Sequence, residues 1–405
     1  MVIKSAKASP IFDSKGFLTV EITVELDDGT IVYGAAPRGS TKGSFEANVY
    51  EDFRGDFISP GVNTAINQFN KYVAPVIKGL PVNFETIDKT LIDLRNTYNV
   101  SSDSIVAASY AILKANAYVE KTSCCDLLGQ TNFETKPVFN IIDGLKAHFS
   151  NLKGIEILLI PKEKTSYFEM VLRASDIFHI LQFDLWEAGY RCDTGPQGAL
   201  TPDFKTLENA LEFLCYSLLK TNKSVFNDFT LGLDMAMSDL FKQNKYSCKF
   251  LNGKSEIKEK NDLFEYYENI TNKFPITYIE DGFSDIDYSG WEKLMHMNPK
   301  IDVVGDDITA SNSERISLCI DKNLINSVVI KPNQVGTISE SVKSLQFAKK
   351  HNLNTIVSQR TSETEDNIIS HLALGCNADM IKVGAPNRMD RISKSNEMIR
   401  LSRSI

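Results

Sequence analysis

Residues 328–358, VVIKPNQVGTISESVKSLQFAKKHNLNTIVS, contain the strand–helix–strand pattern that decides the fold. One β-branched run in this stretch ends abruptly at Lys331, and a second one ends at Ser358. Between them, Thr337 and Glu340 have the spacing of a capping box, which predicts that a helix begins there. That helix would present one apolar face, formed by Ile338, Val342, Leu345 and Ala348.

The same alternation of strand and helix patterns recurs along the chain from about residue 137 onwards. Short β-branched runs that end in a polar residue lie at 232–234, 276–280, 303–306, 328–331, 355–358 and 380–382. Segments of helix length separate these runs. Such alternation predicts a parallel sheet, and the length of this part of the chain suits a closed (β/α) barrel.

The first third of the chain has a different pattern, typical of an α+β unit. Apolar residues alternate with polar ones over 20–26, and Asp28-Gly29 then leads into a second apolar run at 31–33. We expect these two runs to form a hairpin. Helical patterns fill the chain from about 60 to 125.

The length of 405 residues fits a barrel plus a smaller unit. We expect an N-terminal α+β domain at 1–128 and the barrel domain at 133–405. The net charge of −8 argues against binding to nucleic acid or to an anionic membrane surface. No early apolar stretch resembles a signal peptide, and none has the length of a membrane span. The seven cysteines show no CxxC pattern and no disulfide-like spacing, so we expect free thiols and a cytoplasmic protein.

Five charged residues end predicted strands: Asp234, Glu280, Asp306, Lys331 and Lys382. In a barrel of this kind the C-terminal strand ends converge on one mouth, so we expect these side chains to meet there. Three carboxylates at one mouth would repel one another unless a cation neutralised them. Hard oxygen donors favour Mg²⁺, which also leaves coordination positions for water and substrate.

The two lysines suggest the chemistry of this mouth. Beside a dication and a second ammonium group, the pKa of a lysine should fall toward the range of a general base. Such a base can remove a proton from the carbon next to a metal-bound carboxylate, while the other lysine pairs with substrate anions. Arg360 lies beside Thr361 and Ser362, an arrangement that suits a phosphate or phosphonate group. The expected ligand is therefore a small phosphorylated or phosphonylated carboxylic acid.

Along essentially the whole chain, the sequence resembles the enolase family. The matching stretches are 14–21, 232–234, 279–281, 305–307, 330–337, 363–366 and 381–384. The resemblance implies an α/β fold with a modified (β/α)8 barrel and an N-terminal α+β capping domain, assembled as a homodimer or higher homo-oligomer. It also implies Mg²⁺-dependent conversion of 2-phosphoglycerate to phosphoenolpyruvate.

Carried over by position, the resemblance assigns roles to single residues. The metal ligands would be Asp234, Glu280, Asp306 and, for a second substrate-bridging metal, the Thr41 hydroxyl. Lys331 would be the catalytic base, and Glu156 would be one of the two catalytic glutamates of the family. The substrate-binding residues would be Lys382, Arg360, Thr361 and Gln359.

Five positions depart from the family pattern. Thr194 replaces the second catalytic glutamate, and Ala147 occupies a histidine position, with His148 one place later. The family's glutamine before Glu156 is Ile155, its histidine before Arg360 is Gln359, and its serine after Arg360 is Thr361. The proton-abstracting half of the reaction therefore keeps its residues, while the half that expels the β-hydroxyl loses its acid. Loss of a positioned general acid costs about 10²–10⁴-fold in rate.

Three interpretations follow from these departures. The chain is a slow enolase in which Glu156, Asp193 or a metal-bound water replaces the acid, or it is a repurposed paralogue resembling the carboxyphosphonoenolpyruvate synthases of phosphonate metabolism. In the third interpretation it is a non-catalytic binding protein that has kept the fold. The complete set of metal carboxylates and lysines argues against the third, so we expect an enolase-type lyase acting on a phosphorylated or phosphonylated three-carbon acid.

Overall fold

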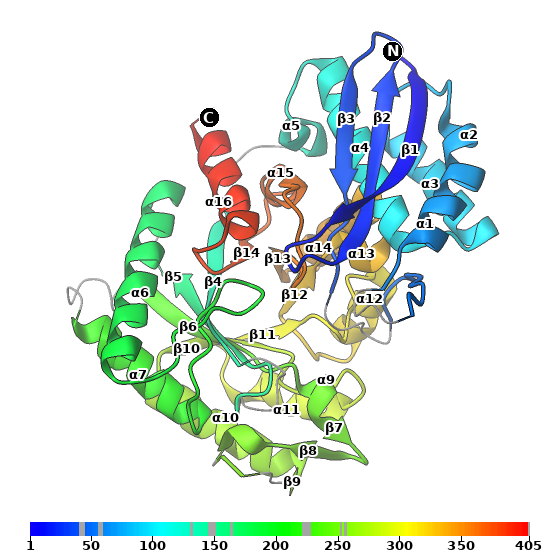
Figure 1. The fold of residues 1–405 in the computed structure, drawn as a ribbon. Helices are drawn as coiled ribbons and strands as arrows, with labels where there is room; N and C mark the ends of the chain where they lie inside the picture. Colours follow the sequence, from blue (N-terminus) through cyan, green and yellow to red (C-terminus); the bar gives the residue numbers. More distant parts are fainter. Residues whose placement is uncertain are drawn as a thin grey trace.

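The structure is a computed structural model that describes residues 1–39, 45–55, 60–129, 133–144, 151–162, 165–220, 228–251, 253–254 and 257–403. An N-terminal sheet with its helices lies against one side of a barrel whose strands and outer helices follow in the chain (Figure 1). The predicted linker at 129–132 lies outside the described residues except for Gly129. No helix among the described residues has the length and apolarity needed to cross a membrane.

The N-terminal part contains an antiparallel three-stranded sheet in the order β1 (Ile3–Phe12), β2 (Leu18–Leu26) and β3 (Ile31–Ala35). The predicted hairpin is confirmed, with Gly29 turning the chain at a φ of 88°. Alternate residues of β2, from Val20 to Leu26, are buried as the sequence pattern requires. At Gly34 the sheet approaches the helix that contains Ala107. A Cβ atom on residue 34 would lie 2.1 Å from the Ala107 carbonyl oxygen.

Helical segments follow this sheet in the chain. They are α1 (Asn63–Gln68), the π-helix η1 (Phe69–Val73), α2 (Ala74–Ile77), α3 (Phe84–Tyr98), α4 (Ser102–Glu120) and α5 (Cys124–Leu128). The long helix α4 packs directly on β2 and β3 and is buried along most of its length.

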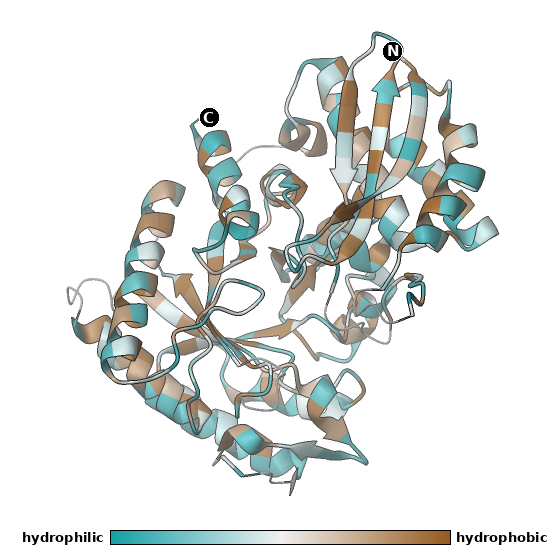
Figure 2. Ribbon diagram, in the orientation of Figure 1, coloured by the Kyte–Doolittle hydropathy of each residue, from teal (hydrophilic) through white to brown (hydrophobic). Residues whose placement is uncertain are grey.

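Eight strands close the barrel in the order β10, β11, β12, β13, β14, β4, β5, β6. Their bounds are β4 (Lys136–Asp143), β5 (Glu156–Pro161), β6 (Phe229–Asp234), β10 (Ile276–Glu280), β11 (Asp302–Gly305), β12 (Ser327–Ile330), β13 (Asn354–Ser358) and β14 (Met380–Gly384). All six runs that the sequence predicted as strands are confirmed, with bounds that agree to within three residues. The barrel interior is packed with apolar side chains, and Figure 2 shows hydrophobic strands inside helices of mixed character.

The predicted parallel sheet is confirmed for the six predicted runs, whereas β5, which the sequence pattern did not predict, runs in the opposite direction. β5 pairs antiparallel with both β4 and β6, whereas the remaining pairs are parallel. The connection from β4 to β5, residues 144–155, is at the lower limit of length for a parallel crossover, which usually contains a helix, so an antiparallel pairing is favoured. The reversal brings the first residue of β5, Glu156, to the mouth where the other strands end.

The barrel helices lie outside the strands. They are α6 (Tyr167–Glu187), α7 (Leu207–Lys220), α10 (Lys260–Lys273), α11 (Tyr288–Met297), α12 (Ser313–Asp321), α13 (Pro332–Val335), α14 (Ile338–Lys350), α15 (Ile368–Gly375) and α16 (Met389–Ser402). Smaller elements follow β6, namely α9 (Met237–Leu240), β7 (Phe241–Lys242), β8 (Lys245–Ser247), the 3₁₀ helix η2 (Lys249–Leu251) and β9 (Ile257–Lys258).

The predicted start of α14 is confirmed. The Thr337 hydroxyl accepts a hydrogen bond from the Glu340 main-chain N–H at 3.1 Å. It donates in turn to the Glu340 carboxylate at 2.9 Å. On the apolar face, Ile338, Leu345 and Ala348 are buried, and Val342 is half-buried.

Candidate active site

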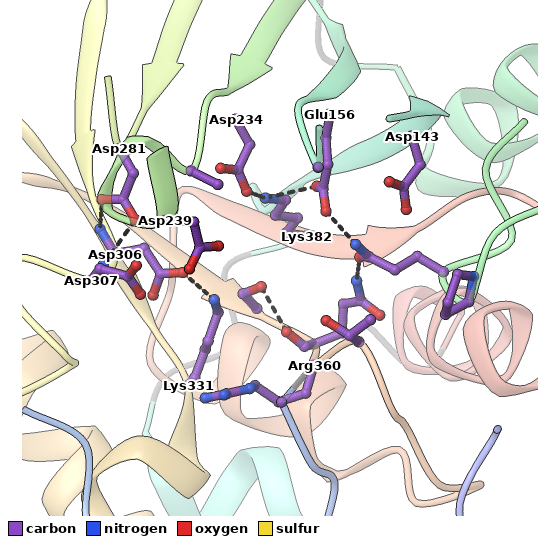
Figure 3. Close-up of a pocket in the computed structure, with 18 of the residues that line it drawn as sticks. Asp143, Glu156, Asp234, Asp239, Asp281, Asp306, Asp307, Lys331, Arg360 and Lys382 are labelled. Atoms are coloured by element: carbon purple, nitrogen blue, oxygen red, sulfur yellow. Dashed lines mark hydrogen bonds and ion pairs between the residues drawn. The ribbon is translucent and has the colours of Figure 1, made fainter. Parts of the chain in front are cut away.

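One cavity of about 240 Å³ opens at the mouth where the strand ends converge (Figure 3). The sequence-predicted residues that line it are Glu156, Asp234, Asp306, Lys331, Gln359, Arg360, Thr361 and Lys382. Glu280 is fully buried and joins this group through its contact with Lys382. Thr41 lies outside the described residues. The charged and amide side chains that line the cavity without having been predicted are Glu46, Asp143, Gln197, Asp239, Asp281 and Asp307.

Lys382 on β14 joins three carboxylates that come from three other strands. Its ammonium nitrogen lies 2.7 Å from Asp234 Oδ2, 2.9 Å from Glu280 Oε2 and 3.2 Å from Glu156 Oε2. Burial alone would lower the pKa of Lys382, but these carboxylates, with Asp234 foremost, raise it well above the usual value. Lys382 therefore stays charged, which suits the pairing with an anion rather than proton abstraction.

Lys331 follows β12 directly, and its ammonium group contacts Asp306 Oδ2. The other carboxylate oxygen of Asp306 accepts a hydrogen bond from Gln334 at 3.1 Å. Burial alone would lower the pKa of Lys331, but the attraction of Asp306 outweighs burial and raises it. The lowered pKa expected from the sequence depended on a dication and a second ammonium group beside the lysine, whereas in the structure Lys331 pairs with Asp306.

The carboxyl groups around Lys382 carry more negative charge than the lysine can balance. The pKa of Glu280 is raised to about 8, first by burial and then by Asp234, although Lys382 opposes the shift. Its Oε2 accepts hydrogen bonds from Tyr278 at 2.6 Å and from Lys382, while its Oε1 has no hydrogen-bond partner among the described residues. A buried carboxylate oxygen without a partner is expected where a further ligand belongs.

A second group of carboxylates also has the spacing of a cation site. Ligand oxygens of Asp281, Asp306 and Asp307 lie within 4.8 Å of one another. However, both oxygens of Asp281 accept main-chain hydrogen bonds, from Asp306 at 3.1 Å and from Asp307 at 3.0 Å. Because Asp281 is occupied in holding this turn, we favour Asp234, Glu280 and Asp306 as the ligand set. Their oxygen donors and their excess negative charge fit a Mg²⁺ ion.

Arg360 lies two residues beyond β13, and other parts of the chain hold it firmly in place. Its main-chain N–H donates to Glu363 Oε1 at 2.8 Å, and its carbonyl oxygen accepts from Arg391 at 2.6 Å. The guanidinium group contacts Asn333 at 3.3 Å and Glu46 of the N-terminal part at 3.1 Å. Glu46 therefore occupies a position from which an anionic ligand would displace it. No motif marked Glu46 in the sequence, since its approach to Arg360 depends on how the two parts of the chain pack.

Glu156 is held from two sides. Its Oε2 faces Lys382, and its Oε1 accepts a hydrogen bond from the Gln197 amide. The Gln197 oxygen in turn accepts from the Gln359 amide, which leaves Gln359 Oε1 buried without a hydrogen-bond partner among the described residues. Burial raises the pKa of Glu156, whereas Lys382 and Gln197 both counteract that rise. Gln197 was not predicted from the sequence.

The residues that depart from the family pattern lie in different places in the structure. Thr194 is exposed and pairs with Leu200 across a turn, and its neighbour Asp193 is exposed as well. Neither side chain lines the cavity. Ile155 is fully buried beside Glu156. Ala147 and His148 lie outside the described residues.

Comparison with known proteins agrees with this arrangement over the whole chain. Residues 3–128 match the family model "Enolase, N-terminal domain", and residues 134–405 match "Enolase, C-terminal TIM barrel domain". The enolase of Ehrlichia canis is 34% identical over 413 aligned positions, which cover 100% of this chain and 97% of that protein. The enolase of Natranaerobius thermophilus is 31% identical, with coverage of 100% and 96%. The enolase of Ehrlichia ruminantium is 33% identical, with coverage of 98% and 95%. The chain therefore belongs to the enolase family.

Proposed function

We propose that this protein is an enolase-type carbon–oxygen lyase. It would abstract the proton next to the carboxylate of a phosphorylated three-carbon acid and convert 2-phosphoglycerate, or a close analogue, to the corresponding enol phosphate. The observation that carries this proposal is the convergence of two lysines, three carboxylates and Arg360 on one cavity. Family membership supports the same reaction.

Lys331 is the base of the proposed reaction. Its contact with Asp306 keeps it protonated, so it becomes a base only when Asp306 is engaged by another partner. A Mg²⁺ ion held by Asp234, Glu280 and Asp306 would supply that partner and stabilise the negative charge that develops on the substrate carboxylate. The ammonium group of Lys382 remains charged and pairs with the same carboxylate.

Arg360 is the anchor for the phosphate group. Its fixed main chain aims a buried guanidinium group into the cavity, where two parallel N–H groups match two phosphate oxygens. A phosphate bound there would displace Glu46, because one guanidinium edge cannot serve both anions.

The test uses the purified protein with Mg²⁺ and 2-phosphoglycerate in heavy water. Formation of phosphoenolpyruvate is followed by absorbance, and exchange of the C2 proton is followed by NMR. We expect both to occur, to disappear with Lys331→Ala and to stop when the metal is chelated. Exchange without elimination would limit the proposal to proton abstraction and require another leaving group. If the protein shows neither exchange of the C2 proton nor elimination, the proposed function is wrong.

A further inference from the structure

Asp143 is a buried carboxyl group in the cavity for which the reaction above has no role. It is the last residue of β4, and its side chain lines the same cavity as Lys331 and Arg360 (Figure 3). Its main-chain N–H donates to the Leu200 carbonyl at 2.8 Å, and Leu200 is held in turn by Ile141 at 3.0 Å. The residue is therefore fixed by the sheet and by the segment that follows Thr194, and it is only 7% exposed.

The environment of Asp143 differs from that of the carboxyl group beside it. In the pairing of β4 with β5, Asp143 lies opposite Glu156. Glu156 has Lys382 and Gln197 as partners, whereas no hydrogen bond or ion pair among the described residues reaches the Asp143 carboxyl group. Donors stabilise a carboxylate, and burial without donors stabilises a carboxylic acid. Neighbouring carboxyl groups with such different surroundings commonly divide into a proton donor and an anion.

The charges that face Asp143 act in opposite directions. Glu156 on β5 and Asp234 on β6 disfavour its ionised form, while Lys382 on β14 and Arg391 on α16 favour it. Burial dominates these effects, and together they raise the pKa of Asp143 to about 8. The carboxyl group therefore holds its proton at neutral pH.

We infer that Asp143 donates the proton to the departing hydroxyl group, the role that Thr194 cannot perform; this rests on the function proposed above. Lys331 takes the C2 proton, and the electron pair of that C–H bond enters the carboxylate as an enolate. The pair then returns to form the C2–C3 double bond while the C3–O bond breaks. The leaving oxygen takes the Asp143 proton and departs as water. Asp143 is left as a carboxylate and Lys331 as an ammonium group, and proton exchange with solvent restores both.

The other acids near the cavity suit this step less well. Asp193 is exposed and does not line the cavity, and Thr194 has no acidic proton near neutral pH. Glu156 already pairs with Lys382 and accepts a hydrogen bond from Gln197, and both contacts favour its ionised form. Both oxygens of Asp281 accept main-chain hydrogen bonds from the turn that carries Asp306, and Asp307 lies in that turn beside the proposed metal ligand.

The experiment compares Asp143→Asn with Asp193→Asn on two substrates, 2-phosphoglycerate and its analogue with chlorine in place of the C3 hydroxyl. Chloride leaves without a proton, so it does not need the acid. We expect Asp143→Asn to lower dehydration by about 10²–10⁴-fold. The variant should keep C2-proton exchange and chloride elimination, and Asp193→Asn should behave as the wild type.

Several outcomes would overturn this assignment. Dehydration and chloride loss that fall together in Asp143→Asn would indicate a structural role, and unchanged dehydration, or a loss in Asp193→Asn instead, would exclude Asp143 as the donor. In these cases the wild type still turns over, so the proposed function survives. A wild type with neither exchange nor elimination removes both proposals. As a measurement independent of turnover and of folding of the variants, ¹³C NMR of carboxyl-labelled aspartate should show Asp143 protonated at pH 7; a carboxylate there would contradict the inference.

Discussion

Two neighbouring carboxyl groups, Asp143 and Glu156, show how single contacts decide the chemistry of this cavity. Both are buried, and they face each other across paired strands. What separates them is their partners, because Lys382 and Gln197 both contact Glu156, whereas no hydrogen bond or ion pair among the described residues reaches the Asp143 carboxyl group. An amide cannot act as an acid, but it can orient an anion. Gln197 thus acts through Glu156 as a positioning residue.

Replacing Gln197 tests how much its hydrogen bond to Glu156 contributes to stability. Gln197→Leu keeps the volume but leaves a buried oxygen of Glu156 without its donor. We expect the free energy of unfolding to fall by about 1–3 kcal/mol, measured by urea denaturation. Gln346 lies on the exposed side of α14, and Gln346→Leu should change stability by less than about 0.5 kcal/mol. Equal effects of the two substitutions would show that the Gln197 amide does not hold Glu156.

Strand ends carry most of this site, and for that reason much of it was predictable. A run that stops at a charged residue predicts both the strand and the side chain at the mouth, as for Asp234 and Lys331. Lys382 also lines the mouth, although β14 continues for two residues beyond it. The antiparallel direction of β5 could not be predicted in this way, because hydrophobic periodicity indicates which residues are buried but not in which direction a strand runs. The resemblance to a known family supplied Glu156, but only the antiparallel pairing explains how it reaches the mouth.

The residues that the sequence did not reveal reach the cavity in two ways. Glu46 and Gln197 enter it through contacts between segments far apart in the chain, whereas Asp143 is the last residue of β4. None of them belongs to a motif, and an Asp or Gln in a loop is usually a surface residue. Such non-local contacts depend on how elements pack, which patterns along one segment do not record. The exposed position of Thr194 was hidden from sequence analysis for the same reason.

The pair of helices α15 and α16 predicts a pH dependence of stability. His371 on α15 lies 3.3 Å from Glu397 on α16. Burial would lower the pKa of His371, but Cys125 and Glu397 raise it to about 9. A raised pKa means that the folded state binds the proton more tightly than the unfolded state. The resulting stability is complete below about pH 6.5 and is lost as the pH rises through about 9.

We therefore expect the free energy of unfolding to fall by roughly 2–3 kcal/mol between these two pH values. His371→Gln should remove this part of the decline, as measured by denaturant titrations at several pH values. His296→Gln, on the exposed side of α11, should leave it unchanged. The same decline in His371→Gln as in the wild type would show that another group is responsible.

The N-terminal part completes the cavity as well as covering the barrel. Arg95 on α3 pairs with Glu340 at 2.7 Å, and Lys114 on α4 pairs with Asp366 at 2.7 Å. These contacts hold the N-terminal part over the ends of β12 and β13, on the side of the mouth that carries Arg360. A third contact, between Glu46 and Arg360, differs from the other two because it engages a residue proposed to bind substrate.

This third contact predicts that the N-terminal part competes with the ligand. Glu46 lies 3.1 Å from the Arg360 guanidinium and also accepts a hydrogen bond from Gln334 at 3.3 Å, so it holds the position that a phosphate oxygen would take. Glu46→Gln removes the competing charge and the repulsion toward the incoming anion. We expect 2-phosphoglycerate to bind roughly tenfold more tightly in calorimetric titration, which corresponds to about 1.4 kcal/mol. The matched control is Glu51→Gln, because Glu51 lies in the same segment, is 59% exposed and faces Arg38 at 3.5 Å instead. Weaker binding by Glu46→Gln alone would mean that Glu46 holds Arg360 in its binding position rather than competing for it.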